Sequence, residues 1–353
     1  MSCRARERVS KNTQSVQLSG VGAFKRTIEN QLPMTLTAAV IGCGGAGRNH
    51  ASGYDEIDDV DLVGVCDLEL ERAQSLADAF GCPAFTTVDE LLADASPDIV
   101  SVATPERHHV DPVLAALDAG ADVFCEKIMA HSMAAGRELA DAAQRAEGWL
   151  AVDYNYRHMP TFARVQEAIT TDEIGEVHLA TAQSHAFGWH HTLDLIRFLL
   201  GEPTSVQATL RHDPDRVADR HQMDDLLYVP SHAVAATFEF PSGSTASVTA
   251  SIHTDLDNHL IDLAVYGEAG RVGPINMTPS DSKGAPDSGV LVDELQETAS
   301  ITLDESFRRS VAAFVEAIRQ GDEPPTTWED GLAVMELEAA VLDAAETGQR
   351  VAL

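Results

Sequence analysis

The feature that most constrains the fold of this chain is a glycine-rich turn between a short apolar run and a longer amphipathic segment. Leu36–Ile41 is apolar enough for a buried strand, and the sequence GCGGAG at Gly42–Gly47 follows it directly. We expect a helix from about Gly47. Glycine-rich turns are common, but the spacing G-x-G-x-x-G between a strand and a helix is typical of the first turn of a parallel α/β sheet.

The residues of this turn have distinct expected roles. Gly42 permits the tight turn, Gly44 lets the backbone approach a pyrophosphate, and Gly47 lets helix and strand pack closely. Gly45 and Ala46 lie just before the expected helix, whose N-terminal N–H groups and dipole attract phosphates. The turn therefore predicts a dinucleotide site, and a tight turn without a ligand is the alternative.

An acidic residue at the end of the next strand identifies the dinucleotide. Val60–Cys66 is the second expected strand, and Asp67 follows it, 20 residues after Gly47. A carboxylate there accepts hydrogen bonds from the adenosine ribose hydroxyls and repels a 2′-phosphate. The sequence therefore predicts NAD as the cofactor and makes NADP the less favoured choice.

The pattern of elements divides the chain into a basic extension and two domains. Residues 1–33 carry six basic side chains and no clear apolar period, so we expect a disordered extension, or sequence upstream of a start at Met34. Strands and helices alternate through 34–156, which predicts a Rossmann domain with a doubly wound parallel sheet. Longer alternating strands in 157–353 predict an α+β domain with a large, mainly antiparallel sheet.

Composition excludes several functions. The 353 residues carry a net charge of −32, which repels nucleic-acid phosphates, and no apolar run is long enough for a membrane span. The five cysteines form no C-x-x-C pair, as expected for a reduced cytoplasmic protein without a disulfide framework. Periodic apolar segments argue against disorder, so we interpret the acidic surface as that of a folded protein from a high-salt (halophilic) cytoplasm.

Lysine is rare, which draws attention to one position. After Met34 the chain contains only Lys127 and Lys283, and Lys127 lies at the carboxyl end of the expected strand Asp122–Cys125. Open α/β sheets bind ligands at that edge. A lysine there can exchange a proton with an alcohol oxygen during hydride transfer, although a salt bridge at a strand end is the alternative.

Taken together, these residues resemble those of the Gfo/Idh/MocA oxidoreductases, which include glucose-fructose oxidoreductase and inositol dehydrogenase. The resemblance covers about Met34 to Leu353. Its landmarks are the glycine turn, Asp67, Thr104-Pro105 with His109, Glu126-Lys127, Asn155 and Arg157 with Pro160, Ile174-Gly175-Glu176-Val177, His191 with Asp194, and Thr347-Gly348.

The resemblance implies a role for each landmark near the active site. Thr104, Pro105 and His109 would line the nicotinamide side, while Glu126 and Lys127 would meet cofactor and substrate. Asn155 and Arg157 would lie near the domain junction, where substrate binds. The C-terminal sheet would build the substrate site and the interface of a homo-oligomer, a dimer or tetramer.

Three departures from the family pattern concern the catalytic end. The family motif E-K-P ends in Ile128 here, and the usual aspartate four residues before His191 is replaced by Phe187. The segment between Val177 and His191 is also short. Asp194 would lie one helical turn beyond His191, so catalysis would depend on Lys127 and His191 or on an unidentified acid.

The histidines near position 190 allow more than one interpretation. His190 and His191 point to different faces of a helix, so a metal site is disfavoured. His191 is either a substrate-pocket residue or a structural residue at a helix start. His109 is either a helix cap or a pocket residue, and His108 is expected to be solvated.

We therefore expect an NAD-dependent oxidoreductase that acts on a CH–OH group of a sugar, cyclitol or related polyol, with Lys127 and His191 as catalytic residues. A dinucleotide-binding sensor or regulatory protein without catalysis is the alternative from another class. A metal-dependent lyase with tightly held NAD is a third hypothesis.

Overall fold

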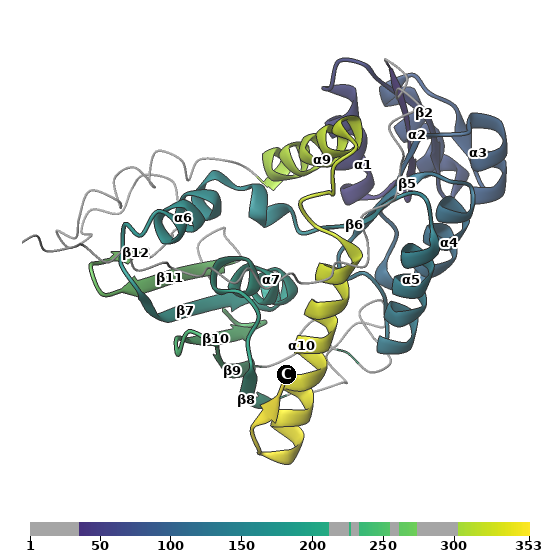
Figure 1. Cartoon of the computed structure of the whole chain (residues 1–353). Helices are drawn as coiled ribbons and strands as arrows, with labels where there is room; N and C mark the ends of the chain where they lie inside the picture. Colours follow the sequence, from purple (N-terminus) through teal and green to yellow (C-terminus); the bar gives the residue numbers. More distant parts are fainter. Residues whose placement is uncertain (1–34, 212–225, 227–232, 255–260, 274–302) are drawn as a thin grey trace, which may run out of the picture.

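The computed structural model describes residues 35–211, 226, 233–254, 261–273 and 303–353. The expected extension at 1–33 and Lys283 lie outside these ranges. In the described part, the strands form two sheets, and each sheet is packed against helices (Figure 1). The two expected domain types, a Rossmann fold and an α+β unit with a mainly antiparallel sheet, are both confirmed.

The first sheet is parallel throughout and has the strand order β3-β2-β1-β4-β5-β6. Its direction of winding reverses between β1 and β4, which creates a crevice at the carboxyl ends of these strands. The buried strands are almost wholly apolar because helices cover both faces. The strands are β1 (Leu36–Ile41), β2 (Val60–Cys66), β3 (Ala84–Phe85), β4 (Ile99–Val102), β5 (Asp122–Glu126) and β6 (Leu150–Asp153).

The helices of this domain begin close to where the sequence predicts them. The first begins at Gly45 rather than Gly47, with Gly44 as its N-cap and the carbonyl oxygen of Gly44 accepting the backbone N–H of Arg48 at 3.0 Å. A 3-10 turn, η1 (Glu106–His108), precedes the fourth helix. The helices are α1 (Gly45–Asp55), α2 (Leu70–Phe80), α3 (Val88–Ala95), α4 (Val110–Asp118) and α5 (Met133–Arg145).

The second sheet has the order β12-β11-β7-β10-β9-β8-β13 and is antiparallel except for the β7–β10 pair. Side chains alternate along its strands, so that one face is buried and the other exposed. The strands are β7 (Val177–His185), β8 (Ser205–Arg211), β9 (Ala233–Glu239), β10 (Thr245–Ser251), β11 (Ile261–Gly267), β12 (Arg271–Val272) and β13 (Val351–Ala352).

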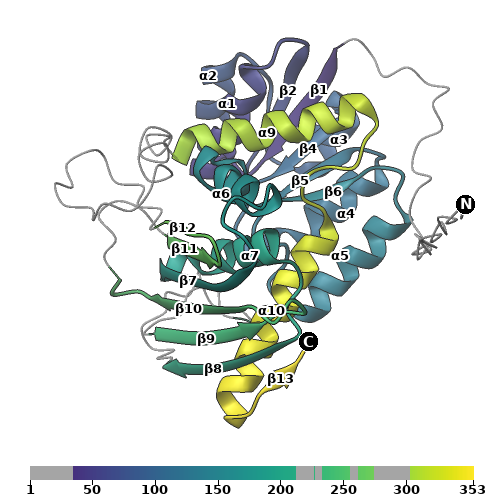
Figure 2. The ribbon, with the colours of Figure 1, turned by 60° about the vertical axis from the view of Figure 1, so that its left-hand side comes forward.

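The buried face of this sheet lies against helices that also face the first domain (Figure 2). Helix α7 (Trp189–Leu200) contacts β7 and β10, α10 (Trp328–Thr347) contacts β8, and α6 (Pro160–Thr170) packs on α7. Short 3-10 turns, η2 (Asn155–His158) and η3 (Ala186–Gly188), lead into α6 and α7. The elements between the two sheets thus carry the residues expected near the substrate.

Helix α9 (Leu303–Gln320) belongs to the second half of the chain but packs on the first domain, beside α1 (Figure 2). Its Val311, Phe314, Val315 and Ile318 join the same buried cluster as β1. Val311 lies directly against Gly53 of α1, where a Cβ atom would come within 2.9 Å of it. The Rossmann domain is therefore completed by a helix from the far end of the sequence.

Candidate active site

The glycine turn, Gly42–Gly47, forms a concave surface that we call the cradle. Its backbone is closely packed at some glycines and open to solvent at others, in agreement with their expected roles. Gly42 has φ of +95°, and a Cβ there would lie 2.6 Å from the backbone of Ala103. A Cβ on Gly47 would lie 1.8 Å from the carbonyl oxygen of Gly42. At Gly44 and Gly45 a Cβ would meet nothing within 4 Å. The turn is therefore closely packed at Gly42 and Gly47 and open at Gly44 and Gly45.

The open side of the cradle is a helix N-terminus suited to an anion. No side chain caps α1, and its first turn carries no acidic residue. Its N-terminal N–H groups therefore remain available to phosphate oxygens. A cavity of about 1050 Å³ begins here and is bordered by Gly42, Gly44, Gly45 and Ala46. The residues present thus fit the pyrophosphate of a dinucleotide.

Asp67 lies at the edge of the same cavity, at the end of β2. Its Oδ2 accepts a hydrogen bond from the backbone N–H of Cys43 at 2.9 Å, and its Oδ1 accepts one from Glu69 at 2.9 Å. The carboxylate is thereby fixed against the glycine turn. Each oxygen keeps a further lone pair with which to accept a ribose hydroxyl.

Beyond β4, the cavity is lined by Thr104, Pro105 and His108. His108 is exposed, as the sequence predicts, yet it contributes to the cavity wall. His109 instead is fully buried, and its ring nitrogens lie 2.8 Å from the carbonyl oxygen of Thr104 and 2.9 Å from that of Ile128. Burial lowers the pKa of His109. His109 occupies the N-cap position of α4, but its side chain makes no capping hydrogen bond there and instead connects the loops after β4 and β5.

Glu126 and Lys127 lie at the carboxyl end of β5, beside the crevice. Glu126 is 9% exposed, and its Oε2 accepts the backbone N–H of Lys127 at 3.1 Å. The peptide bond between Lys127 and Ile128 is cis, although proline is absent. Neither Glu126 nor Lys127 is among the residues that border the large cavity.

Glu126 also belongs to a buried cluster that the sequence did not reveal. His50 of α1 lies 3.3 Å from Glu126 and 3.2 Å from Asp153, measured from its Nε2 to a carboxylate oxygen of each. Among the described residues, these three are the group whose ligand atoms are close enough to hold a metal ion. No sequence pattern points to this cluster, because its members come from three separate elements.

His191 lies at the other side of the site, on α7. Its ring stacks on Tyr156 with the centroids 4.3 Å apart. Burial lowers the pKa of His191 well below its usual value, and the positive charge of Lys127 acts in the same direction. His191 is therefore neutral at pH 7. The two residues expected to be catalytic are thus brought close enough to interact electrostatically.

Arg157 and Asp194 form a buried ion pair. The guanidinium of Arg157 contacts both carboxylate oxygens of Asp194, at 3.1 and 2.9 Å from Nε, and contacts Asp330 of α10 at 2.9 Å. Burial raises the pKa of Asp194 to about 6, while Arg157 favours the ionised form. These contacts favour a structural role for Arg157 and Asp194 over the expected contact with substrate.

Asn155 contacts α9, whereas Arg157 contacts α7. Its side-chain amide donates to Ser306 of α9 at 2.9 Å, which connects the domain junction to that helix. Within the described residues, its buried Oδ1 has no hydrogen-bond partner. Asn155 therefore keeps an acceptor at the junction, as expected of a residue that contacts substrate.

Phe187, which replaces the family aspartate, lies in η3 and is 39% exposed. Its ring stacks on His185 with a centroid separation of 5.2 Å. Strand β7 ends at His185, so η3 follows it without any covering segment. The position that should hold an acid therefore presents an aromatic ring.

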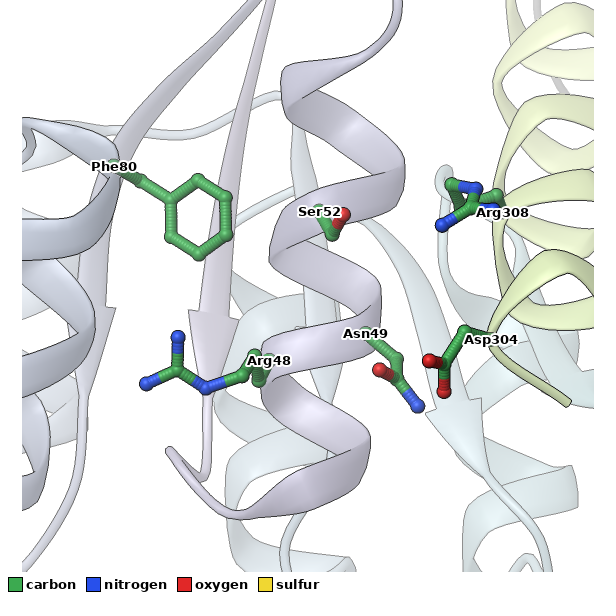
Figure 3. A pocket seen from close by; sticks show the side chains of 6 residues that line it. All are labelled: Arg48, Asn49, Ser52, Phe80, Asp304 and Arg308. Carbon is green, nitrogen blue, oxygen red and sulfur yellow. The ribbon is translucent and has the colours of Figure 1, made fainter.

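A second cavity of about 260 Å³ lies along α1, away from the cradle (Figure 3). Arg48 and Phe80 lie on one side of the helix, and Asp304 and Arg308 of α9 lie on the other. Arg308 contacts Glu305 of its own helix at 2.7 Å. This cavity therefore marks the junction of α1 and α9.

Comparison with known proteins gives the chain its family. Residues 36–154 match the model described as an oxidoreductase family with an NAD-binding Rossmann fold, and residues 186–353 match the C-terminal alpha/beta domain of the same family. Within the described residues, no helix is both long and apolar enough to cross a membrane.

Individual relatives match along most of their length. The chain is 27% identical to D-glucoside 3-dehydrogenase of Escherichia coli (strain K12), covering 90% of this chain and 97% of that one. It is 29% identical to inositol 2-dehydrogenase of Rhizobium meliloti (strain 1021), covering 90% and 99%. A solved structure from Sinorhizobium meliloti 1021, provisionally assigned as a myo-inositol dehydrogenase, has a TM-score of 0.75 at 26% identity and covers 90% and 99%.

The cradle with Asp67, the paired domains and both family matches lead to one conclusion: the chain belongs to the Gfo/Idh/MocA family of NAD-binding oxidoreductases.

Proposed function

We propose that this protein oxidises a secondary hydroxyl of a sugar, cyclitol or related polyol, or reduces the corresponding carbonyl. The observation that carries the proposal is the position of Lys127 at the carboxyl end of β5 in the Rossmann domain, from where its positive charge helps to lower the pKa of buried His191 on α7. The relatives named as glucoside and inositol dehydrogenases support this substrate class.

In the proposed mechanism, the protein moves one proton and fixes the substrate. NAD, when bound, supplies the hydride acceptor. Lys127 takes the proton from the reacting hydroxyl during oxidation and returns it during reduction. Neutral His191, stacked on Tyr156, orients the same hydroxyl by a hydrogen bond. Asn155 directs its Oδ1 toward another hydroxyl of the substrate.

The cofactor site is proposed to use residues on two sides of the large cavity. Gly42, Gly44, Gly45, Ala46 and Gly47 hold the pyrophosphate at the start of α1. Asp67 accepts the adenosine ribose hydroxyls. Thr104 and Pro105 face the nicotinamide, while the contacts of His109 and Glu126 fix the loops around it.

Replacing Lys127 tests the proposal. Lys127→Met is expected to lower kcat by about 10²- to 10⁴-fold with NAD and a panel of sugars and cyclitols, because the proton acceptor is lost. The matched control is Lys283→Met, which removes the other lysine found after Met34. NAD affinity, followed by protein fluorescence, is expected to stay within a few fold in both variants.

A protein that binds NAD without catalysis remains the second candidate, favoured by the exposed Phe187 at the position of the family aspartate. It predicts that NAD binds but that no member of the panel is turned over. Equal activity of Lys127→Met and the unmodified protein would contradict the proposed role of Lys127.

We also infer a homo-oligomer built on the exposed face of the second sheet. Along β9 and β10 the exposed side chains of that face are small, namely Ala233, Ala235, Thr237, Ser247 and Thr249, and the half-buried Glu239 ends the row on β9. Such a flat surface allows close approach of a second copy. Light scattering after size exclusion, which measures the mass of the particle, is expected to give a dimer or tetramer.

A further inference from the structure

The proposed mechanism gives no function to one buried group of polar side chains. His50 of α1, Glu126 of β5 and Asp153 of β6 offer ligand atoms that all lie within 4.8 Å of one another. The side chains of His50 and Asp153 are fully buried, and that of Glu126 is 11% exposed. Burying two carboxylates is costly unless a positive charge or hydrogen bonds compensate them. The cluster therefore needs a compensating partner.

Each of the three side chains has one polar atom held by a neighbour outside the cluster. The contacts are Nδ1 of His50 with the hydroxyl of Ser101 at 2.9 Å, Oε2 of Glu126 with the backbone N–H of Lys127 at 3.1 Å, and Oδ1 of Asp153 with the hydroxyl of Ser310 at 2.5 Å. Outer contacts of this kind orient metal ligands and fix the tautomer of a ligating histidine. They leave Nε2, Oε1 and Oδ2 of the three residues facing one another.

The three inward atoms cannot satisfy one another by hydrogen bonds. Nε2 of His50 lies 3.3 Å from Oε1 of Glu126 and 3.2 Å from Oδ2 of Asp153. It carries at most one hydrogen, and a carboxylate has none to donate. The contact with Glu126 has the geometry of a hydrogen bond, whereas Oδ2 of Asp153 is buried without a hydrogen-bond partner among the described residues. An unpaired carboxylate oxygen therefore faces the other two atoms.

The separations within the cluster are close to the ligand spacing of a tetrahedral zinc site. Zn²⁺ binds imidazole nitrogen and carboxylate oxygen at about 2.0–2.2 Å, which places neighbouring ligand atoms of a tetrahedron about 3.3–3.5 Å apart. An imidazole among the ligands favours Zn²⁺ over Mg²⁺ and Ca²⁺, which prefer oxygen ligands alone. A divalent ion also cancels the charge of the two carboxylates.

We propose that His50, Glu126 and Asp153 bind one Zn²⁺ ion through Nε2, Oε1 and Oδ2. Three protein ligands leave one tetrahedral position for water, and the side chain of Glu126 is the part of the cluster that reaches solvent. The ion joins α1, β5 and β6. Because the other oxygen of Glu126 holds the backbone of Lys127, the ion also fixes the end of β5. The site takes no part in the proposed proton transfer and does not depend on it.

The metal content of the full chain tests the proposal without turnover. The protein is prepared without a histidine tag, stripped with EDTA, dialysed against a small excess of zinc sulfate and then against metal-free buffer. Elemental mass spectrometry is expected to find about one equivalent of zinc per chain, because a site formed by folding holds its ion against dialysis. A chain that retains no zinc overturns the proposal and leaves a cluster compensated by protons.

Two variants distinguish this site from the many carboxylates of the acidic surface. His50→Gln and Asp153→Asn each remove one ligand. Both are expected to weaken zinc binding by more than about 100-fold, since loss of an outer partner alone costs about 10- to 100-fold. The matched controls, His178→Gln and Asp141→Asn, remove an exposed histidine and an exposed aspartate and should bind zinc as the unmodified chain does. Competition with a chromophoric chelator measures the affinities, and equal affinity in all five proteins overturns the proposal.

The coordination itself is tested with Co²⁺ in place of Zn²⁺. The unmodified chain is expected to show the intense visible absorption of a four-coordinate site, and Asp153→Asn is expected to lack it. EDTA should lower the melting temperature of the unmodified chain but not that of Asp153→Asn, because the ion binds the folded state. Asp153→Asn preserves side-chain shape, so the test stays decisive if His50→Gln does not fold. A six-coordinate Co²⁺ spectrum, or displacement of Zn²⁺ by an equal concentration of Mg²⁺ or Ca²⁺, overturns the assignment.

Discussion

Asp67 combines a structural contact with the selection of the cofactor. Its two carboxylate oxygens accept backbone N–H groups from Cys43 in the glycine turn and from Glu69 at the start of α2. The side chain is thus fixed before any ligand arrives. A fixed acceptor loses little conformational entropy on binding, so its hydrogen bonds to a ribose contribute more of their energy to affinity.

Asp67→Ser is expected to weaken the preference for NAD. The variant loses charged hydrogen bonds worth about 1.5–3 kcal/mol and no longer repels a 2′-phosphate. The ratio of kcat/KM for NAD to that for NADP should therefore fall by about 10-fold or more. Asp89→Asn, which removes another carboxylate from the cavity wall, is the control. An unchanged ratio in Asp67→Ser would show that Asp67 does not contact the ribose.

At this scale the sequence reveals local features and misses distant ones. The glycine turn, Asp67 and Lys127 were predicted because their meaning depends on neighbours along the chain. The partnership of His50 with Glu126 was missed because 76 residues separate them. Arg157 and Asp194 were expected near substrate, but their mutual contact could not be known before α7 was placed against η2.

Among the elements, a buried ion network joins η2, α7 and α10. Arg157 contacts Asp194 and Asp330, and Arg197 contacts Asp330 at 3.2 Å and the exposed Glu202. Asp330 also belongs to the capping box of α10. The network therefore fixes the helix that carries His191 relative to the last long helix of the chain.

Asp194→Asn is expected to lower the free energy of unfolding by about 3 kcal/mol, because it leaves the buried guanidinium of Arg157 with one carboxylate fewer. Glu202→Gln is the control, since Glu202 is 67% exposed and its loss should cost less than about 1 kcal/mol. Urea denaturation followed by tryptophan fluorescence measures both. Comparable losses in the two variants would contradict the distinction between buried and exposed pairs.

Secondary structure was largely predictable from the sequence, since the strands β1 and β2 have the expected bounds. Which strands pair with one another was harder to predict. The expected antiparallel pairing is confirmed for β9 and β10, whereas the parallel pairing of β10 with β7 along its other edge was not predicted. Alternation of side chains reveals a buried face, but it does not identify the neighbouring strand.

For the whole molecule, the dominant property is a net charge of −32. Mutual repulsion of surface carboxylates destabilises a compact state, and salt screens that repulsion. High salt therefore favours the folded state of a chain with this charge. The melting temperature is therefore expected to rise by about 10 °C or more between 0.1 M and 2 M KCl, a range over which the screening length falls severalfold.

Scanning calorimetry at several salt concentrations measures this change. A sulfate salt at equal ionic strength provides the control, because it strengthens apolar burial as well as screening charge. A melting temperature that does not change in KCl would contradict the proposed dependence on screening.

The packing of α9 on the Rossmann domain has a consequence for the order in which the protein is made. Residues 34–156 leave the ribosome well before Leu303–Gln320 are synthesised. Until then, the Rossmann domain lacks the apolar side chains of α9, among them Phe314, which stacks on Phe124 of β5. A gene fragment that stops after β6 encodes every residue of the nucleotide cradle and still lacks one wall of its hydrophobic core.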